Sequence, residues 1–554
     1  MGSWRARRDP TVRTNTVHHG KGEGILAVDG ASPRIEENVL RDNALPGVMV
    51  RRTGSSPFVR GNRISGSSTD GIAIVEGASP RVEENEVWGS RLRGIMINGA
   101  GTDPLVRANP VHDGAGNGIF VADGATPRIE ENEVWGNANP GIWIGSPGTD
   151  PQVRANRVHD GAGNGIVVME GASPSIVDND VWGHPEPGIG IGGVGTNGLI
   201  RANRVHDGSG GGITVSDGAR PQVEANDIWG NAAGGITVRG AGTDPVVRAN
   251  RVHDERGVGM FIIEGASPRL EANEISANAE VGLAVSGRGT DPQIVGNWIH
   301  DGRSAGVLIA AGASPRFEDN EVWAHHEFGV TISGVGTQPI VRANRVHDGR
   351  SAGLIVGNGA QPRIDRNEIW GNAQHAIGIG GVGTDPLVRS NHVQDGQHNG
   401  IFVQDGASPR LEENEIRANA GPGIMITGSG TGAVIRANRI HDGQNNGILV
   451  HDGASPTIED NDLSGNALVQ LAIVAAGSDP IVRNNRIHDG PSGGILISAG
   501  ASPTVERNEI WGSPKGGIVV QGSGTRPLIS ANGLRENGGE AISFLDGATP
   551  SSAC

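Results

Sequence analysis

A repeat of 47 residues runs through almost the whole chain and constrains its fold more than any other feature. The tetrapeptide GASP, or a close variant, marks each repeat, and successive copies are separated by 47 residues without an insertion or deletion. The copies begin at Gly30, Gly77, Gly124, Gly171, Gly218, Gly265, Gly312, Gly359, Gly406, Gly453, Gly500 and Gly547. A fixed period of this length indicates a solenoid, in which each repeat packs on its neighbours in sequence.

Each repeat contains two similar halves. An asparagine recurs alternately 24 and 23 residues apart, in segments such as NEVW and NRVH, and 23 such positions run from Asn15 to Asn532. Within each half, short bursts of alternating apolar and polar residues are separated by Gly, Pro, Asn and Asp. This pattern is typical of short strands joined by turns. Three strands and three turns in 23 or 24 residues predict one coil of a parallel β-helix.

We therefore predict an all-β chain with a single right-handed parallel β-helix of about 23 coils and a 47-residue double-coil repeat. The expected β-helix covers residues 9–546, with tails at residues 1–8 and 547–554. The chain has no Tyr and only seven Phe, which suits a bore too narrow for large rings.

Inward residues such as Ile129, Val134, Ile142 and Ile144 should stack as an aliphatic core, whereas Trp143 stands on an inward strand position or at its edge. The recurring asparagines should form a structural ladder, because stacked amides satisfy one another and Asn suits a turn with left-handed backbone angles. The ladder includes Asn85, Asn109, Asn132, Asn156, Asn179 and Asn203.

Charge alternates from coil to coil beside this ladder. The residue after the asparagine is acidic in ten of eleven NEVW-type coils and is Arg in seven of twelve NRVH-type coils. Two residues before the asparagine the swap repeats, as in Glu83 and Glu130 against Arg107 and Arg154. These positions lie above one another in a parallel solenoid, so a slip of one coil would bring like charges together. We interpret the alternation as a device that sets register.

Trp and His alternate three residues after the asparagine, on the same outward face as the charges. In one interpretation the rings stack on each other and cover the strand backbone. In the other they form a contact stripe for sugar rings or for a protein partner. The candidate binding residues are Trp88, His112, Trp135, His159, Trp182, His206, Trp229 and His253. We expect no metal there, because histidines two coils apart cannot share an ion.

The pattern of GI-x-[IV], P-x-[IV]-x-x-N and x-[IV] segments resembles the parallel β-helix repeats of the pectin-lyase-like superfamily, over nearly the whole chain. The alternation of EENEVWGN (130–137) with VRANRVHDG (153–161) is most similar to the β-helix of the F-box substrate receptor of a cullin-type ubiquitin ligase and its bacterial relatives. The resemblance implies the fold and a protein-recognition role. It does not extend to ligase activity, because neither an F-box-like segment nor a zinc-binding Cys/His domain is present.

Other members of that superfamily are polysaccharide lyases, hydrolases and epimerases, which usually build a cleft from long loops. Here the twelve repeat starts pass without an extra residue, so we expect no unique active site and no cofactor. The first hypothesis is a non-enzymatic scaffold that binds a protein partner through the Trp/His face. The alternative is a carbohydrate-binding or polysaccharide-acting protein, which as an enzyme would be a lyase or glycoside hydrolase.

The composition of the chain limits the kinds of partner that it is expected to bind. Acidic residues outnumber basic ones by 61 to 45, which argues against nucleic acid. No apolar run is long enough to span a membrane, and Cys554 is the only cysteine. The N-terminus lacks the apolar core of a signal peptide, so the expected location is cytoplasmic, or extracellular if the N-terminus is incomplete. Without obvious end caps, the chain should associate end to end or be a fragment of a larger protein.

Overall fold

The structure is a computed structural model that describes residues 10–551. These residues form 69 strands, three for each of 23 coils, and no helix. Residues 10–551 therefore contain no helix that is long and apolar enough to cross a membrane. The predicted N-terminal tail, residues 1–8, and the last three residues of the predicted C-terminal tail lie outside the described part of the chain.

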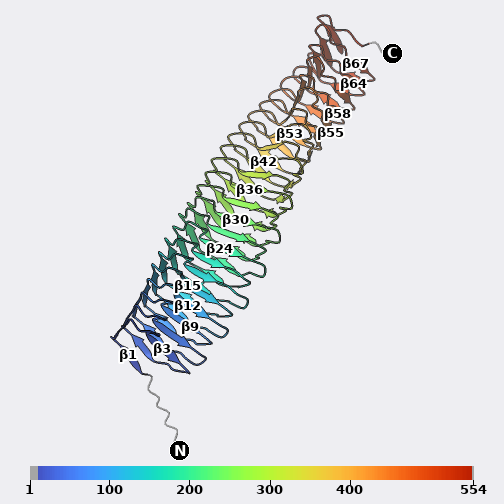
Figure 1. Ribbon diagram of the computed structural model, residues 1–554. Helices are drawn as coiled ribbons and strands as arrows, with labels where there is room; N and C mark the ends of the chain where they lie inside the picture. Colours follow the sequence, from blue (N-terminus) through green and yellow to red (C-terminus); the bar gives the residue numbers. More distant parts are fainter. Residues whose placement is uncertain (1–9, 552–554) are drawn as a thin grey trace, which may run out of the picture. The chain divides into compact units, whose positions relative to one another are not determined.

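The chain divides into two compact units, residues 1–274 and 275–554. In each unit, every coil adds one strand to each of three parallel sheets, which we call the first, second and third sheet in chain order (Figure 1). The strands extend from β1 (Thr11–Arg13) to β69 (Ile542–Leu545). The predicted fold class, an all-β parallel β-helix of about 23 coils with a 47-residue double-coil repeat, is confirmed.

The strands discussed below are three to six residues long. The first sheet of unit 1 contains β10 (Arg81–Glu83), β13 (Leu105–Arg107), β16 (Arg128–Glu130), β19 (Gln152–Arg154), β22 (Ser175–Val177), β25 (Leu199–Arg201), β28 (Gln222–Glu224) and β31 (Val246–Arg248). Its second sheet contains β11 (Glu86–Trp88), β14 (Pro110–His112), β17 (Glu133–Trp135), β20 (Arg157–His159), β23 (Asp180–Trp182), β26 (Arg204–His206), β29 (Asp227–Trp229) and β32 (Arg251–His253). Its third sheet contains β15 (Asn117–Ala122), β18 (Ile142–Ile144), β21 (Ile166–Val168), β24 (Ile189–Gly192), β27 (Ile213–Ser216) and β33 (Met260–Ile263). The third sheet of unit 2 contains β45 (Leu354–Gly357), β48 (Ile377–Gly380), β51 (Ile401–Gln404) and β54 (Ile424–Thr427).

The core is a stack of aliphatic side chains from alternate strand positions. Ile129, Val134, Ile142 and Ile144 are fully buried, as predicted. Trp143 does not point inward: it is half-buried on the outer face of β18, where its ring stacks on Phe120 of β15 at 4.5 Å between centroids. The strand alternation places it there, because both of its neighbours on β18 are inward isoleucines.

The asparagine ladder is confirmed in detail. The side-chain oxygen of Asn156 accepts hydrogen bonds from the backbone N–H and the side-chain amide of Asn132, both at 2.9 Å. The amide of Asn156 donates to the carbonyl of Ile129 and to the oxygen of Asn179. The left-handed residue of this turn is not the asparagine but the one before it, such as Ala155 at φ 53°. The asparagine is therefore required for its amide and not for its backbone angles.

A second, incomplete row of buried polar side chains follows the Trp/His position, and the sequence analysis missed it. Asn137 accepts a hydrogen bond from the backbone N–H of Gly114 at 3.0 Å, and Asn372 accepts one from Gly349 at 3.1 Å. Three coils carry an ionisable residue in this row instead of an amide. These residues are His184, Glu255 and His325, each only 1% exposed.

Candidate functional site

The predicted Trp/His stripe lies on the outer face of the second sheet of unit 1. Trp182 on β23 is in register with His159 on β20 and with His206 on β26. All eight rings form one continuous stack with interplanar angles of 16° or less. Each His centroid lies 4.2 Å from the next Trp, and each Trp centroid lies 5.8–6.1 Å from the next His.

Stacking leaves the edges of these rings outward and covers their faces. The guanidinium of Arg157 lies 5.3 Å from the centroid of Trp182, and that of Arg204 lies 5.7 Å from the centroid of Trp229. A sugar ring stacks on the face of an aromatic ring, so the stripe offers no such platform within its length. The arrangement is the one expected if the rings stabilise the sheet, and the binding role of the eight residues stays a prediction.

Each stripe histidine contacts the carboxylate of the following aspartate through Nδ1, and His206 and His253 contact a second carboxylate through Nε2, whereas Nε2 of His159 has no hydrogen-bond partner among the described residues. His206 contacts Asp207 through Nδ1 at 2.8 Å and Asp180 through Nε2 at 3.0 Å. His253 makes the same two kinds of contact, with Asp254 and with Asp227. Nitrogens engaged in this way are poor metal ligands, and residues 10–551 contain no group of three His, Cys, Asp or Glu side chains able to hold an ion.

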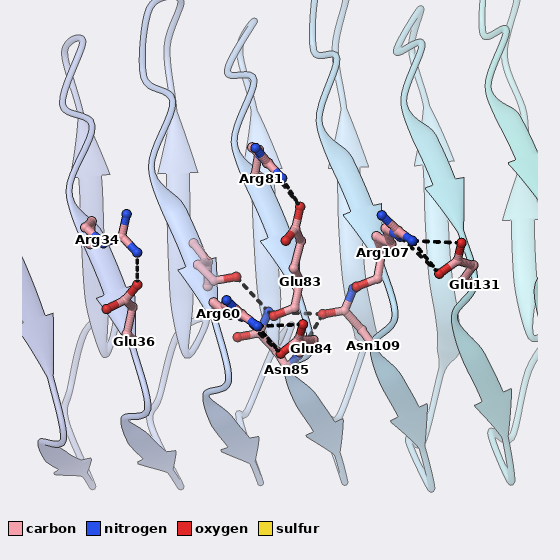
Figure 2. Close-up of polar contacts among 11 residues, drawn as sticks. Arg34, Glu36, Arg60, Arg81, Glu83, Glu84, Asn85, Arg107, Asn109 and Glu131 are labelled. Carbon is pink, nitrogen blue, oxygen red and sulfur yellow. Dashed lines mark hydrogen bonds and ion pairs between the residues drawn. The ribbon is translucent and has the colours of Figure 1, made fainter.

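The predicted charge rows are in register, but their ion pairs are less regular than the sequence implies. Arg107 on β13 lies opposite Glu130 on β16. Its guanidinium nevertheless bonds to the next residue, Glu131, at 2.9 Å, while Arg81 pairs with Glu83 on its own strand at 2.7 Å (Figure 2). Many outward charges of the regular coils are therefore paired with one another and are less available to a ligand.

The repeat is interrupted on the third sheet of unit 2. There β48 carries Gly378 and Gly380 at its two outward positions, between Ile355 on β45 and Phe402 on β51. The missing side chains leave a hollow of about 320 Å³, bordered also by polar side chains. These polar residues are Asn358, His375, Gln404 and Asp405.

A second hollow of about 380 Å³ adjoins the first and shares His375 and Phe402 with it. The ring of His375 lies 4.5 Å from that of Phe402 and 4.8 Å from that of His398. The lining is completed by Gln374, by Asn399 and by Met425, which lies one coil after Phe402. We call these two hollows together the Phe402 cleft.

Two residues that line the Phe402 cleft each contain a buried polar atom without a hydrogen-bond partner among the described residues, namely Nδ1 of His375 and Oδ1 of Asn399. Burial, with a smaller contribution from His398, lowers the pKa of His375 to about 4. The imidazole is therefore neutral at pH 7 and able to donate or accept a hydrogen bond, depending on its tautomer.

Unit 1 has a related interruption four repeats earlier. Gly190 and Gly192 on β24 stand where Gly378 and Gly380 stand in β48. The hollow there is smaller, about 270 Å³, and its lining contains no aromatic ring. The sequence signal for both hollows is the segment IGIGG, at 189–193 and 377–381, in which two consecutive outward positions are glycine.

Comparisons with known proteins identify the family to which the chain belongs. A family model described as right handed beta helix region matches residues 3–153, 145–252, 236–346, 332–438 and 422–553. No curated protein sequence matches the chain. Among solved structures, the PL6 family alginate lyase AlyGC is 12% identical over 99% of this chain and 97% of that chain, with a TM-score of 0.33.

Two further solved structures show a similar level of likeness. A mutant of the periplasmic alginate epimerase AlgG is 13% identical over 68% of this chain and 76% of that chain, with a TM-score of 0.27. The Dettilon tailspike protein is 12% identical over 56% of this chain and 60% of that chain, with a TM-score of 0.29. Because the family model matches nearly every residue, the chain belongs to the right-handed β-helix family.

Proposed function

We propose that the protein is a carbohydrate-binding β-helix and that the Phe402 cleft receives a sugar residue. The observation that carries the proposal is the pair of adjoining hollows, one lined by the rings of His375, His398 and Phe402 and the other bordered by amide and carboxylate side chains. A sugar hydroxyl both donates and accepts hydrogen bonds, so it can pair with the amide and carboxylate groups that border the second of these hollows.

The lining suits a sugar in two further ways. Phe402, His375, His398 and Met425 give the hollow a largely apolar lining, against which the C–H groups of a pyranose can pack. Gln404, Asn358 and Asp405 in the adjoining hollow provide amide and carboxylate groups for further hydroxyls. Binding sites for small molecules commonly combine such an apolar surface with a few polar groups.

The first sequence hypothesis, a scaffold that binds a protein partner through the Trp/His face, has no support in the geometry of that face, because its ring faces are covered. The narrower resemblance to the β-helix of the F-box substrate receptor stays a prediction, and so does end-to-end association.

Isothermal titration calorimetry with a panel of neutral and acidic oligosaccharides tests the proposal. We expect saturable binding of at least one sugar, weakened about tenfold or more in Phe402→Ala because the apolar contact is lost. The matched control is Phe261→Ala, which removes a half-buried outward Phe from β33 in unit 1. Silence across the panel, or equal affinity of Phe402→Ala and the wild type, would show that the proposal is wrong.

A further inference from the structure

A second interruption of the repeat lies on the first sheet of unit 1. In the regular NEVW-type coils, the outward positions of this strand carry an arginine or another polar residue and then an acid, as in Arg81 and Glu83. Strand β22 carries Ser175 and Val177 instead. The expected acid is therefore replaced by valine in this coil, while the coils on either side keep their arginines.

Val177 is in register with Arg154 on β19 and with Arg201 on β25. Around it is a hollow of about 360 Å³. The hollow is bordered by Gln152, Val153, Arg154, Ser175, Val177, Asp178, Arg201 and Ala202. Two guanidinium groups thus flank a position from which the carboxylate of the repeat has been removed.

The regular coils show what that carboxylate does. Glu224 on β28 accepts hydrogen bonds from Arg248 on β31, with the nearer nitrogen at 2.7 Å, and its side chain is only 13% exposed. In unit 2, Glu459 is held by Arg483 in the same way, at 2.6 Å. In both pairs the arginine lies 24 residues after the acid. Arg201 has this relation to Val177, which supplies no acceptor.

The two arginines differ in their remaining partners. Arg154 contacts Asp178 at 3.3 Å, and both side chains are about half exposed or more. Arg201 is exposed and has no acidic partner among residues 10–551. Glu224, the acid in register above it, is already engaged by Arg248. The hollow therefore keeps one uncompensated positive charge, beside a second guanidinium that is only partly neutralised.

We propose that this hollow binds the carboxylate group of a small organic acid, which takes the place of the missing glutamate. The guanidinium of Arg201 presents paired N–H donors with the planar geometry that a carboxylate accepts. Arg154 adds a second positive charge, the hydroxyl of Ser175 supplies another donor, and Val177 forms an apolar floor. This site is independent of the Phe402 cleft, and its test does not depend on sugar binding.

Nuclear magnetic resonance relaxation of ¹³C-labelled acetate at low salt provides the test, with labelled acetamide as the uncharged probe. We expect saturable broadening of the acetate signal, little effect on acetamide, and affinity reduced about tenfold or more by Arg201→Ala. Arg483→Ala is the matched control, because Arg483 occupies the same strand position but is held by Glu459 at 2.6 Å. It should leave acetate binding unchanged.

The decisive variant is Val177→Glu, which restores the acid of the repeat. It should abolish acetate binding while the melting temperature stays equal or rises, because a glutamate at this position is held by arginines in other coils. Equal acetate affinity in Val177→Glu and the wild type would overturn the proposal, as would the absence of any saturable acetate response. Equal loss in Arg483→Ala would show that acetate responds only to the general charge of the surface, and would overturn the proposal.

Discussion

Replacing Glu255 by glutamine should make the protein markedly more stable at alkaline pH. Glu255 is 1% exposed and stands in the second polar row. Its carboxyl accepts hydrogen bonds from the backbone N–H of Asn231 at 2.6 Å and from its side-chain amide at 3.2 Å. Burial raises the pKa of Glu255 to about 8 against the lowering effect of these bonds, and the charges of Asp207 and Asp254 raise it further.

The sign of the effect follows from proton linkage. The folded protein keeps the Glu255 proton up to about pH 8, whereas the unfolded chain releases it near pH 4.5. Between these values the folded state binds more protons, so the free energy of unfolding falls as the pH rises through this window. The difference between a pKa of 4.5 and one of about 8 corresponds to about 5 kcal/mol, absent below pH 4.5 and complete above pH 8.

Glutamine keeps the shape of the side chain and an oxygen that accepts from Asn231, but it carries no charge to bury. Glu255→Gln should therefore match the wild type within about 1 kcal/mol at pH 5 and exceed it by several kcal/mol at pH 9. Urea unfolding followed by circular dichroism at pH 5, 7 and 9 measures the difference. Glu170→Gln, at an exposed glutamate, is the control and should change nothing at any pH. A constant difference between Glu255→Gln and the wild type across the three pH values would refute the reasoning.

Two further predictions concern the buried polar rows. Burial lowers the pKa of His325 to about 4, so the unfolded chain binds more protons than the folded protein between pH 6.5 and 4. The variant His325→Asn should therefore remove about 3 kcal/mol of the destabilisation caused by acid. Urea midpoints at pH 7 and 4.5 test this, and the variant His326→Asn, at the exposed neighbour, should have no effect. Asn156→Ala deprives Asn132 of its acceptor and Ile129 of a donor, and should cost about 3 kcal/mol or more; a thermal melt no lower than that of the exposed-turn control Asn197→Ala would contradict it.

Much of the fold could be predicted because the residue pattern of one coil recurs 23 times in the sequence. The asparagine at intervals of 24 and 23 residues fixes the length of a coil, and period-two alternation around residues such as Ile129 and Ile142 identifies the inward positions. Both signals are local and repeated, so an exception in one coil does not hide them. The left-handed residue escaped prediction because it precedes the asparagine and varies between Ala, Glu, Asp and others, with no residue type to mark it.

The candidate sites were harder to predict because they depend on side chains from several coils at once. A Trp and a His at one position of successive coils are compatible with an open platform and with a closed stack, and only ring orientation separates the two. Likewise the sequence places Arg107 opposite Glu130, yet the turn lets its long side chain reach Glu131 instead. The Phe402 cleft requires two glycines in one coil and large side chains in the next. A search for the residues that all repeats share does not detect such a difference between two neighbouring coils.

These observations favour looking for function in the departures from the repeat and not in the repeat itself. In a regular coil the outward groups bind their counterparts in the adjacent coils: ring covers ring, and guanidinium meets carboxylate. Such a coil has little binding energy left for a ligand, since its polar groups would have to exchange one good partner for another. A coil that lacks one member of the pattern leaves its neighbours unsatisfied, as Val177 leaves Arg201 and as Gly378 leaves the cleft beside Phe402. The same reasoning explains why the most conspicuous residues of the sequence, the alternating Trp and His, are poorer binding candidates than single exceptions with no motif of their own.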